Sequence, residues 1–251
     1  MVDFALMHER RPRVSGKCLS KKLSGFARLS VVEENALEEL ATQRVRMFAS
    51  HESLVEEGDK PSVFYLIREG WACGAKHLED GRRQITAVFL PGDICHLDLL
   101  VFNRMDYSVD SLTPLLVSEV TPAAFEELTL VHPKLGHAFW SEALASAAVQ
   151  REWTINIAQR GAFERVAHLI CELFLRLHRV GLTDGNSCEW PLTQVELADA
   201  LGLTGIHINR MLQQLRSEDL IILKGRLMTV PDIAALQRVA GFDADYLNVL
   251  N

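Results

Sequence analysis

Residues 191–230 read PLTQVELADALGLTGIHINRMLQQLRSEDLIILKGRLMTV and carry the signals of two short helices joined by a tight turn. Thr193 and Glu196 have the spacing of a capping box, in which each side chain bonds the backbone of the other residue. Apolar residues then recur at helical spacing until Gly202, which ends the first helix. Thr204 can cap a second helix. The apolar residues on one face of that second helix are Ile208, Met211, Leu212 and Leu215.

The end of the same stretch predicts a β-hairpin. Residues 220–223 and 227–230 are largely apolar, and Lys224-Gly225-Arg226 separates them as a turn. Two short helices about a turn that contains Gly predict a helix-turn-helix. A helix-turn-helix followed directly by a hairpin predicts a winged helix, which is an arrangement that binds DNA.

This pattern resembles the DNA-binding domain of the Crp/Fnr superfamily of bacterial transcription regulators. The resemblance extends over nearly the whole chain, because several Gly turns resemble those of the superfamily's cyclic-nucleotide-binding-like jelly roll. It implies a homodimer that binds double-stranded promoter DNA and works with RNA polymerase. The residues that carry it are Glu57-Gly58-Asp59, Ile67-Arg68-Glu69-Gly70, Leu90-Pro91-Gly92-Asp93, Leu192-Thr193-Gln194, Glu196-Leu197-Ala198, Leu201-Gly202-Leu203-Thr204, His207-Ile208-Asn209-Arg210 and Leu215-Arg216.

Composition favours a soluble protein with two domains. The chain has 251 residues, of which 48% are hydrophobic and 24% charged. No apolar run approaches the roughly 20 residues of a membrane span, and the first residues lack the apolar stretch of a signal peptide, so we expect a cytoplasmic protein. The net charge of −7 means that DNA affinity has to come from the local placement of cations and helix N-termini. The five cysteines form no Cys-x-x-Cys motif, so we predict neither a disulfide framework nor a metal site.

The expected fold is α+β, with an N-terminal β jelly roll, a long helix and a C-terminal winged helix. Between residues 44 and 120, short apolar runs alternate with Gly turns, which is typical of a β-sandwich or roll. The basic start of the chain is expected to be a disordered or loosely docked arm. The predicted divisions are an arm over 1–24, a sensor domain over 25–132, a dimerisation helix over 133–160 and a winged helix-turn-helix over 161–251.

Residues 137–160 contain neither Gly nor Pro and predict one long helix. Small side chains on this helix would let a second helix approach closely, and the resemblance implies that it forms the dimer. The alternative is that the helix packs on the chain's own jelly roll, and both contacts can exist on different faces. The predicted dimer contacts are Trp140, Ala143, Leu144, Ala147, Arg151 and Thr154.

The second helix of the helix-turn-helix is expected to enter the major groove with its N-terminal residues. Arg210 has the donors to bond O6 and N7 of guanine, Asn209 can serve adenine, and Ile206 can contact a thymine methyl group. Thr204 and His207 suit phosphates. For Arg210 the alternative is a solvated side chain or one paired within the protein. The predicted DNA-binding residues are Thr193, Gln194, Thr204, Gly205, Ile206, His207, Asn209, Arg210 and Gln213.

The chain departs from well-known members of the superfamily in two places. Many members carry Arg or Glu at the positions of Gly205 and Ile206, so the preferred half-site need not match theirs. Members that bind cyclic nucleotides use a Glu and an Arg where this chain has Leu97 and Tyr107. Because a buried phosphate without its Arg loses a charge-assisted pair, we expect no cyclic-nucleotide control. No cofactor is predicted and the effector is left open. The predicted pocket residues are Cys95, His96, Leu97, Tyr107 and Ser108.

Two other functions fit individual residues. A metal-dependent, cupin-like enzyme could use His96 and Asp98 with His132 or His137, although the latter two flank the start of a helix and not a barrel strand. A haem-based gas-sensing regulator could use the neighbouring Cys95 and His96, or Cys73 with His77. An iron–sulfur sensor is disfavoured, because Cys18 alone precedes Cys73. A regulator without enzymatic activity remains the prediction.

Overall fold

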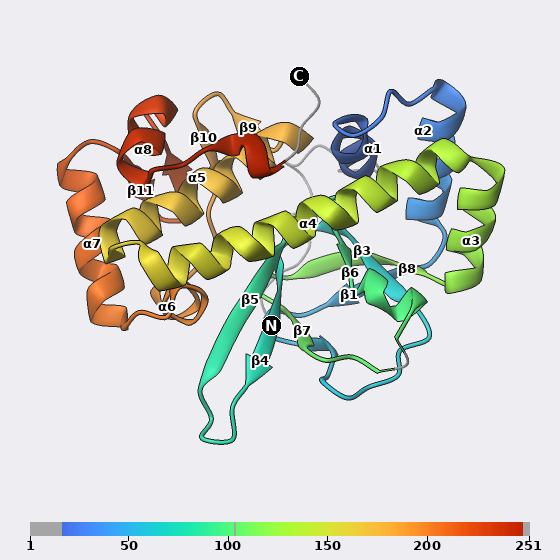
Figure 1. Ribbon diagram of the computed structural model, residues 1–251, viewed down its shortest axis with the longest axis horizontal. Coiled ribbons are helices and arrows are strands. Elements are labelled where there is room, and N and C mark those ends of the chain that lie inside the picture. Colours follow the sequence, from blue (N-terminus) through green and yellow to red (C-terminus); the bar gives the residue numbers. More distant parts are fainter. Residues whose placement is uncertain (1–16, 103, 248–251) are drawn as a thin grey trace.

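A computed structural model of the protein describes residues 17–102 and 104–247 (Figure 1). The long helix α4 (Pro133–Gln159) crosses the molecule diagonally. Strands lie beneath it, and the C-terminal helices lie at its far end. The sheets are followed by a largely helical domain that contains a small wing, so the predicted α+β fold is confirmed.

Eight strands of the described residues form the β-roll (residues 45–120), which is built from two antiparallel sheets. Apolar side chains of both sheets fill the space between them, among them Phe48, Ile67 and Val109. The order in the first sheet is β1 (Val45–Phe48), β8 (Leu115–Val120), β3 (Phe64–Glu69) and β6 (Ile94–Cys95). The order in the second is β2 (Ser53–Val55), β7 (Ser108–Ser111), β4 (Ala72–His77) and β5 (Arg83–Phe89).

Three helices cover one end of the β-roll. Ser30 and Glu33 form the predicted capping box at the start of α2, and Thr121 caps α3. Apolar side chains of these helices surround Phe64 and Leu66 of β3. The helices are α1 (Lys17–Ser24), α2 (Val31–Thr42) and α3 (Pro122–Val131).

Helix α1 corrects the expectation of a loosely docked arm over residues 1–24. It buries Cys18, Leu19 and Leu23, and Leu19 and Leu23 share a face because they are four residues apart. Its backbone also packs on the turn before β6, where a Cβ added to Gly92 would lie 2.8 Å from the carbonyl of Cys18. The sequence did not predict this helix, because its short apolar face lies among basic residues. Residues 1–16 of the predicted arm lie outside the described residues.

The C-terminal residues form the reader domain (residues 162–247). Gly181 ends its first helix in the left-handed conformation, with φ 76°, and Asp232 caps its last α-helix as predicted. Its helices are α5 (Ala162–Val180), α6 (Gln194–Leu201), α7 (Gly205–Ser217), α8 (Ile233–Ala240) and the 3-10 helix η3 (Ala244–Leu247). Its wing strands are β11 (Ile222–Lys224) and β12 (Leu227–Thr229).

The polar segment before α6, which the sequence predicts as a loop, is a short hairpin. It forms a hairpin of β9 (Thr183–Asp184) and β10 (Ser187–Glu189), which turns at Gly185 with φ 55°. Strand β10 also pairs with β12, so the wing belongs to a sheet of order β11-β12-β10-β9. The hydroxyls of Ser187 and Thr229 bond across this pair although 42 residues separate them. Such a distant partner leaves no local signal in a polar segment.

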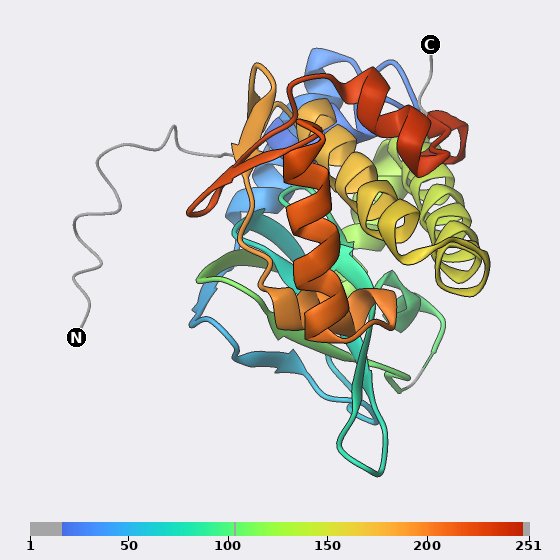
Figure 2. The ribbon, with the colours of Figure 1, turned by 90° about the vertical axis from the view of Figure 1, so that its left-hand side faces the viewer.

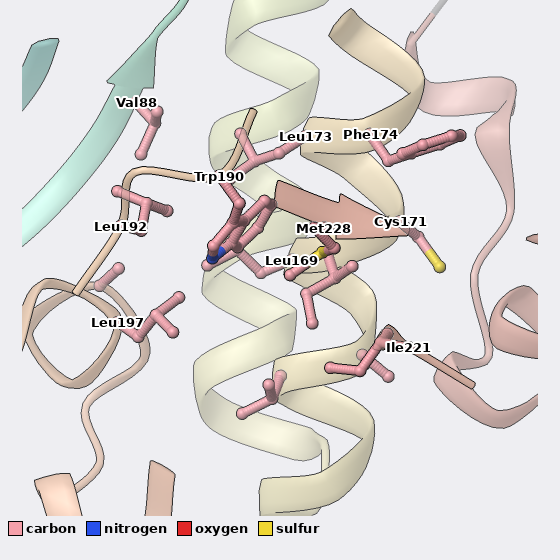
Figure 3. Packing of buried hydrophobic residues seen from close by; sticks show 14 of the residues in the cluster. Val88, Leu169, Cys171, Leu173, Phe174, Trp190, Leu192, Leu197, Ile221 and Met228 are labelled. Carbon is pink, nitrogen blue, oxygen red and sulfur yellow. The ribbon is translucent and has the colours of Figure 1, made fainter. Parts of the chain in front are cut away.

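The reader domain shares a hydrophobic core with the β-roll. Trp190 lies among Leu169, Leu192 and Met228 of the reader domain, and Val88 of β5 approaches from the other side (Figure 3). The Trp190 ring also meets Trp71 edge to face, with ring centroids 6.0 Å apart. Since apolar burial is the dominant favourable term in association, this core fixes where the reader domain sits.

Polar contacts join the same two parts beside the shared core. The guanidinium of Arg83 on β5 pairs with Asp199 of α6 at 2.8 Å, and the Gln84 amide donates to the carbonyl of Ala200 at 3.3 Å. Helix α6 therefore rests directly on the β4–β5 hairpin. Among the described residues, no helix is both long enough and apolar enough to cross a membrane.

Candidate DNA-binding surface and sensor cavity

The caps predicted for the helix-turn-helix are present. The Thr193 hydroxyl accepts from the Glu196 amide at 3.2 Å, and the Glu196 carboxylate accepts from the Thr193 amide at 2.6 Å. Gly202 closes α6 in the left-handed conformation, with φ 60°. The Thr204 hydroxyl accepts from the His207 amide at 3.3 Å and so caps α7. These bonds satisfy backbone amides that a helix start leaves without partners, and they fix the angle between the two helices.

Helix α7 divides into two faces. Its apolar face packs into the core of the reader domain through Ile208, Met211, Leu212 and Leu215, as predicted. Figure 2 shows the helix running along the front of the reader domain with its other face turned outward. The exposed residues at its N-terminal half include every α7 position predicted to contact DNA: Gly205, Ile206, His207, Asn209, Arg210 and Gln213.

Ile206 is the most exposed large apolar side chain of the described residues, at 83%. Arg210 is also exposed, and no carboxylate of the described chain is paired with it. An unpaired guanidinium and an apolar contact group therefore stand free at the start of the helix. This is the chemistry that base edges in the major groove require.

Two polar contacts organise the rest of this surface. The Asn209 amide donates to the Gln194 side chain at 3.3 Å, which links the exposed faces of α7 and α6. The imidazole of His207 lies 3.1 Å from the hydroxyl of Thr204. The sequence places Asn209 and Gln194 fifteen residues apart, so their contact follows from the turn geometry and not from local spacing.

The face of α4 predicted to bind a second copy is uncovered. Trp140 is 66% exposed and Leu144 is 54% exposed, which is unusual for large apolar side chains on a long helix. The other predicted dimer contacts, Ala143, Ala147, Arg151 and Thr154, are exposed as well. The opposite face, with Phe139 and Trp153, packs on the protein itself. Helix α4 thus packs on its own chain through one face and leaves the face predicted for the dimer exposed.

A cavity of about 720 Å³ lies between the β-roll and α4. Three of the five predicted pocket residues line it, namely His96, Leu97 and Tyr107. Cys95 does not reach it, because its side chain is fully buried within the β-roll core. Ser108 lines a second cavity on another face, where its hydroxyl accepts from the Glu57 amide at 3.0 Å.

Burial shifts the pKa of three polar groups that line the cavity in the direction of their neutral forms. His96 is 2% exposed, and burial lowers the pKa of its imidazole to about 4. Its Nε2 lies 3.3 Å from the Val63 carbonyl, while its Nδ1 has no partner. Burial raises the pKa of Tyr107 and that of Asp98. A buried ring nitrogen without a partner is costly, so it favours a ligand that can bond it.

The cations that line the cavity already have partners. Lys76 pairs with Glu57, Lys22 pairs with Asp93, and Arg179 donates to the Lys22 carbonyl while it covers the Phe26 ring. Arginines elsewhere on the β-roll turn away from the cavity. Arg82 pairs with Asp80, Arg83 with Asp199, and Arg104 donates to the Gly58 carbonyl. The position of Tyr107 thus remains without a free cation nearby.

Neither the cupin-like nor the haem alternative gains a ligand set in the described part of the chain. Within it, no group of three or more His, Cys, Asp or Glu side chains is arranged to hold a metal ion. His132 lies between α3 and α4, whereas His96 follows β6 at the start of a short 3-10 helix (Leu97–Leu100). The five cysteines are buried and unpaired with one another, and burial raises the pKa of Cys73 to about 12, so its thiol stays protonated.

Comparison with known proteins agrees with both halves of the chain. The model of the cyclic nucleotide-binding domain matches residues 45–132, and that of the Crp-like helix-turn-helix domain matches residues 164–239. The transcriptional activator protein FnrL of Cereibacter sphaeroides is 30% identical over 216 residues, which cover 83% of this chain and 86% of FnrL. The nitrogen fixation regulation protein FixK of Bradyrhizobium diazoefficiens is 27% identical over 241 residues, or 96% of this chain and 99% of FixK.

Solved structures show the same fold. FixK2 from Bradyrhizobium japonicum superimposes with a TM-score of 0.71 at 22% identity, over 80% of this chain and 98% of its own. A transcriptional regulator of the CRP family from Thermus thermophilus, TTHB099, gives 0.61 at 24% identity, over 78% and 97%. The chain has a β-roll and a winged helix, and its similarity to these relatives covers most of both chains. It therefore belongs to the Crp/Fnr family of transcription regulators, whose members bind DNA through this helix-turn-helix.

Proposed function

We propose that the protein is a homodimer that reads a near-palindromic promoter site through α7, and that no cyclic nucleotide controls it. The observation that carries this proposal is the exposed N-terminal half of α7 in a complete winged helix, with Arg210 unpaired and Ile206 uncovered. The name of its relative FnrL, a transcriptional activator, favours activation, in which case RNA polymerase is a partner. Such a protein works in the cytoplasm, where bacterial promoters are.

The DNA contacts divide between bases and phosphates. Arg210 serves guanine, Asn209 serves adenine, and Ile206 contacts a thymine methyl group. Phosphates are bound by the capped starts of both helices, with Thr193 and Gln194 on α6 and with Thr204, Gly205 and His207 on α7; Gln213 lies one turn further along the same face. The Asn209–Gln194 hydrogen bond at 3.3 Å supports this division. Through it, α6, the helix proposed to cross the DNA backbone, holds in place the Asn209 side chain that is proposed to contact adenine.

The second copy binds the uncovered face of α4. Trp140 and Leu144 stand out from this face, while Ala143 and Ala147 between them leave room for a close helix. Pairing two such helices about a twofold axis removes the apolar side chains from water. It also sets the two copies of α7 about 34 Å apart, which is one turn of DNA.

The proposed domain division follows this arrangement. The sensor domain covers residues 25–132, the dimerisation helix covers 133–160 and the winged helix-turn-helix domain covers 161–251. Helix α4 runs from Pro133 to Gln159, which supports the boundaries at both of its ends. Helix α1 precedes the sensor domain and contacts both other parts, so it is better treated as a connector than as an arm.

The cavity favours an uncharged ligand or none. Tyr107 stands where related proteins place the arginine that pairs a phosphate, and Asp98 and Asp106 also line the cavity. The cations that line the cavity are already bonded within the protein, among them Lys76 to Glu57 and both Lys22 and Arg176 to Asp93. Burying a permanent negative charge without a free cation costs several kcal/mol, so a cyclic nucleotide is disfavoured.

Selection of genomic fragments by the purified protein tests the proposal. We expect enriched fragments to share a near-palindromic sequence with half-sites about one turn apart, and sedimentation to give a dimer at the same protein concentration. Binding that falls steeply with salt but shows no sequence preference would refute the assigned function, since phosphate contacts alone give that behaviour.

A further inference from the structure

Buried charges gather where the reader domain meets the β-roll. Asp93, in the turn before β6, is 5% exposed. Its carboxylate accepts from Lys22 Nζ of α1 at 2.6 Å and from Arg176 Nη2 of α5 at 2.7 Å. Lys22 also pairs with Glu142 of α4, and Arg176 also pairs with Glu172 of α5 at 3.2 Å. We call these five residues the Asp93 cluster.

The cluster joins four separate elements. It connects α1, the turn before β6, α4 and α5, and Arg176 adds a bond to the Val88 carbonyl of β5 at 2.9 Å. Glu172 in turn accepts from the Trp153 indole of α4 at 2.9 Å and from the Tyr246 hydroxyl of η3 at 3.1 Å. Hydrogen bonds and ion pairs thus connect the turn before β6 with α4, α5 and η3.

The charges of the cluster depend on one another. Burial disfavours the Asp93 carboxylate, but Lys22 and Arg176 hold its pKa below the ordinary value of 3.8. Burial likewise disfavours the Lys22 ammonium, but Asp93 and Glu142 raise its pKa. Removing one partner would leave another charge buried and unpaired, which is far more costly than removing both. The cluster therefore favours a single relative position of the elements that carry it.

A second contact prevents rotation about the first. Arg83 of β5 pairs with Asp199 of α6 at 2.8 Å, so this contact is made through a different helix of the reader domain from the one that carries Arg176. One contact would leave the reader domain free to pivot, whereas two contacts on different helices fix its orientation. Because α4 carries the dimer face, the position of α7 relative to the twofold axis is then fixed too.

We propose that the Asp93 cluster sets the half-site spacing that the dimer accepts, with Lys22, Asp93 and Arg176 as positioning residues for DNA recognition. This inference rests on the proposed function, since it requires a dimer that binds two half-sites. Inserting one base pair between half-sites moves one of them by about 3.4 Å along the helix axis and turns it by about 35°. A reader domain held by the cluster cannot follow that displacement, while a loosened reader domain can.

The experiment compares three DNA duplexes: the selected site, the same site with one central base pair added, and the same site with one removed. The wild-type protein is expected to bind both altered duplexes about tenfold or more weakly than the selected site. Asp93→Asn is expected to reduce this ratio to about threefold or less, whereas Lys22→Arg, which keeps the charge, is expected to retain most of it. Lys17→Met, at the exposed start of α1, is the matched control and should leave the ratio unchanged.

A double variant keeps the test decisive if Asp93→Asn alone destabilises the fold. Asp93→Asn with Arg176→Gln removes both charges of that pair, while Lys22 keeps its pair with Glu142 and Glu172 keeps the hydrogen bonds from Trp153 and Tyr246. A spacing ratio that stays at the wild-type value in the folded double variant, as judged by circular dichroism, would overturn the inference. If instead the wild-type protein shows no sequence-specific binding, the proposed function fails, and that result is distinct from unchanged spacing discrimination.

Discussion

Arg210 stands on the exposed face of α7 with no acidic partner in the described chain. In the proposed function, Arg210 bonds one guanine in each half-site through two parallel hydrogen bonds, and replacement by Ala would remove them. We therefore expect Arg210→Ala to cost about 1–3 kcal/mol on the selected site and to flatten the preference at one base pair per half-site. A binding selection with randomised half-sites measures both effects.

The matched control for Arg210 is Gln214, which lies on the same helix and whose amide donates to Glu218 at 3.0 Å. Gln214→Ala should leave base preference unchanged, because that side chain is engaged within the protein. An Arg210→Ala protein with the base preference of the wild type would assign Arg210 to phosphates or to solvent instead.

Histidine burial predicts a loss of stability in mild acid. His168 is 1% exposed and stacks on Tyr246, and burial lowers its pKa from 6.5 to about 4. The unfolded chain thus takes up a proton at this residue below pH 6.5, while the folded chain does not until about pH 4. Stability is complete above the unfolded pKa and falls as the pH drops from 6.5 toward 4. Urea unfolding should show a loss of about 2 kcal/mol from this residue between pH 7 and pH 5.

His168→Phe keeps an aromatic ring against Tyr246 but removes the titrating group. Its unfolding free energy should therefore change less between pH 7 and pH 5 than that of the wild type. His137→Gln replaces an exposed imidazole on α4 and serves as the control, with the full wild-type pH dependence. An equal pH dependence in all three proteins would show that His168 titrates normally in the folded state.

Sequence patterns predicted residues whose role is local. The capping pairs of α2 and α6 were readable because their partners are three residues apart. The partners of Asp93 were not readable, since Lys22 and Arg176 are 71 and 83 residues away. The prediction that put Tyr107 and Ser108 in one pocket overlooked a local rule. Successive residues of extended chain point to opposite faces, so Tyr107 lines the large cavity while Ser108, at the start of β7, lines the other one.

At the scale of single elements, α4 carries the next prediction. Its uncovered face places Ala143 and Ala147 one helical turn apart between larger apolar side chains. Replacing both by Glu would bury like charges between two close helices, so we expect the dimer to dissociate at micromolar concentration and the DNA affinity to fall by about tenfold or more. Sedimentation velocity and a binding titration measure these two effects.

Ala123→Glu on α3 is the control for this pair, because that residue is exposed on a helix away from the α4 face. It should sediment as the wild type does. A dimer of native DNA affinity in the Ala143→Glu, Ala147→Glu protein would place the interface elsewhere.

Long or strongly patterned elements were predictable, and short ones were not. Helix α4 was predictable because residues 137–160 contain neither Gly nor Pro, and the Gly residues at 161 and 181 bound α5. Helix α1 has only eight residues, and most of its stability comes from Leu19 and Leu23 packing against distant helices. The β9–β10 hairpin likewise depends on its pairing with the wing. In both cases the tertiary partner, and not the local sequence, decides the structure.

At the scale of the whole molecule, the sensor and the reader domain form one continuous body. The cavity, the Asp93 cluster and the Trp71–Trp190 contact all lie along the boundary between them. Lys22 and Arg176 line the cavity and belong to the cluster at once. A ligand in the cavity would therefore contact Lys22 and Arg176 directly, and these are the side chains that bond the reader domain to the β-roll through Asp93.

The chemistry of the cavity leads to the last prediction, which concerns the ligand that it excludes. Cyclic AMP and cyclic GMP carry a permanent negative charge. The cavity offers them the Tyr107 hydroxyl and two carboxylates at Asp98 and Asp106. Its cations are already bonded within the protein: Lys76 to Glu57, Lys22 and Arg176 to Asp93, and Arg179 to the Lys22 carbonyl. We expect both nucleotides to bind no tighter than about 1 mM, or about −4 kcal/mol, and to leave DNA affinity unchanged.

Titration calorimetry with adenosine alongside cyclic AMP separates charge from shape. Adenosine lacks the phosphate, so it should bind at least as well as cyclic AMP if the charge is what the cavity rejects. A micromolar dissociation constant for cyclic AMP would contradict the argument, because a cation would then have to leave its present partner. Lys76 and Lys22 are the two lysines placed to do so, and Lys76→Met would show which of them releases its carboxylate to the phosphate.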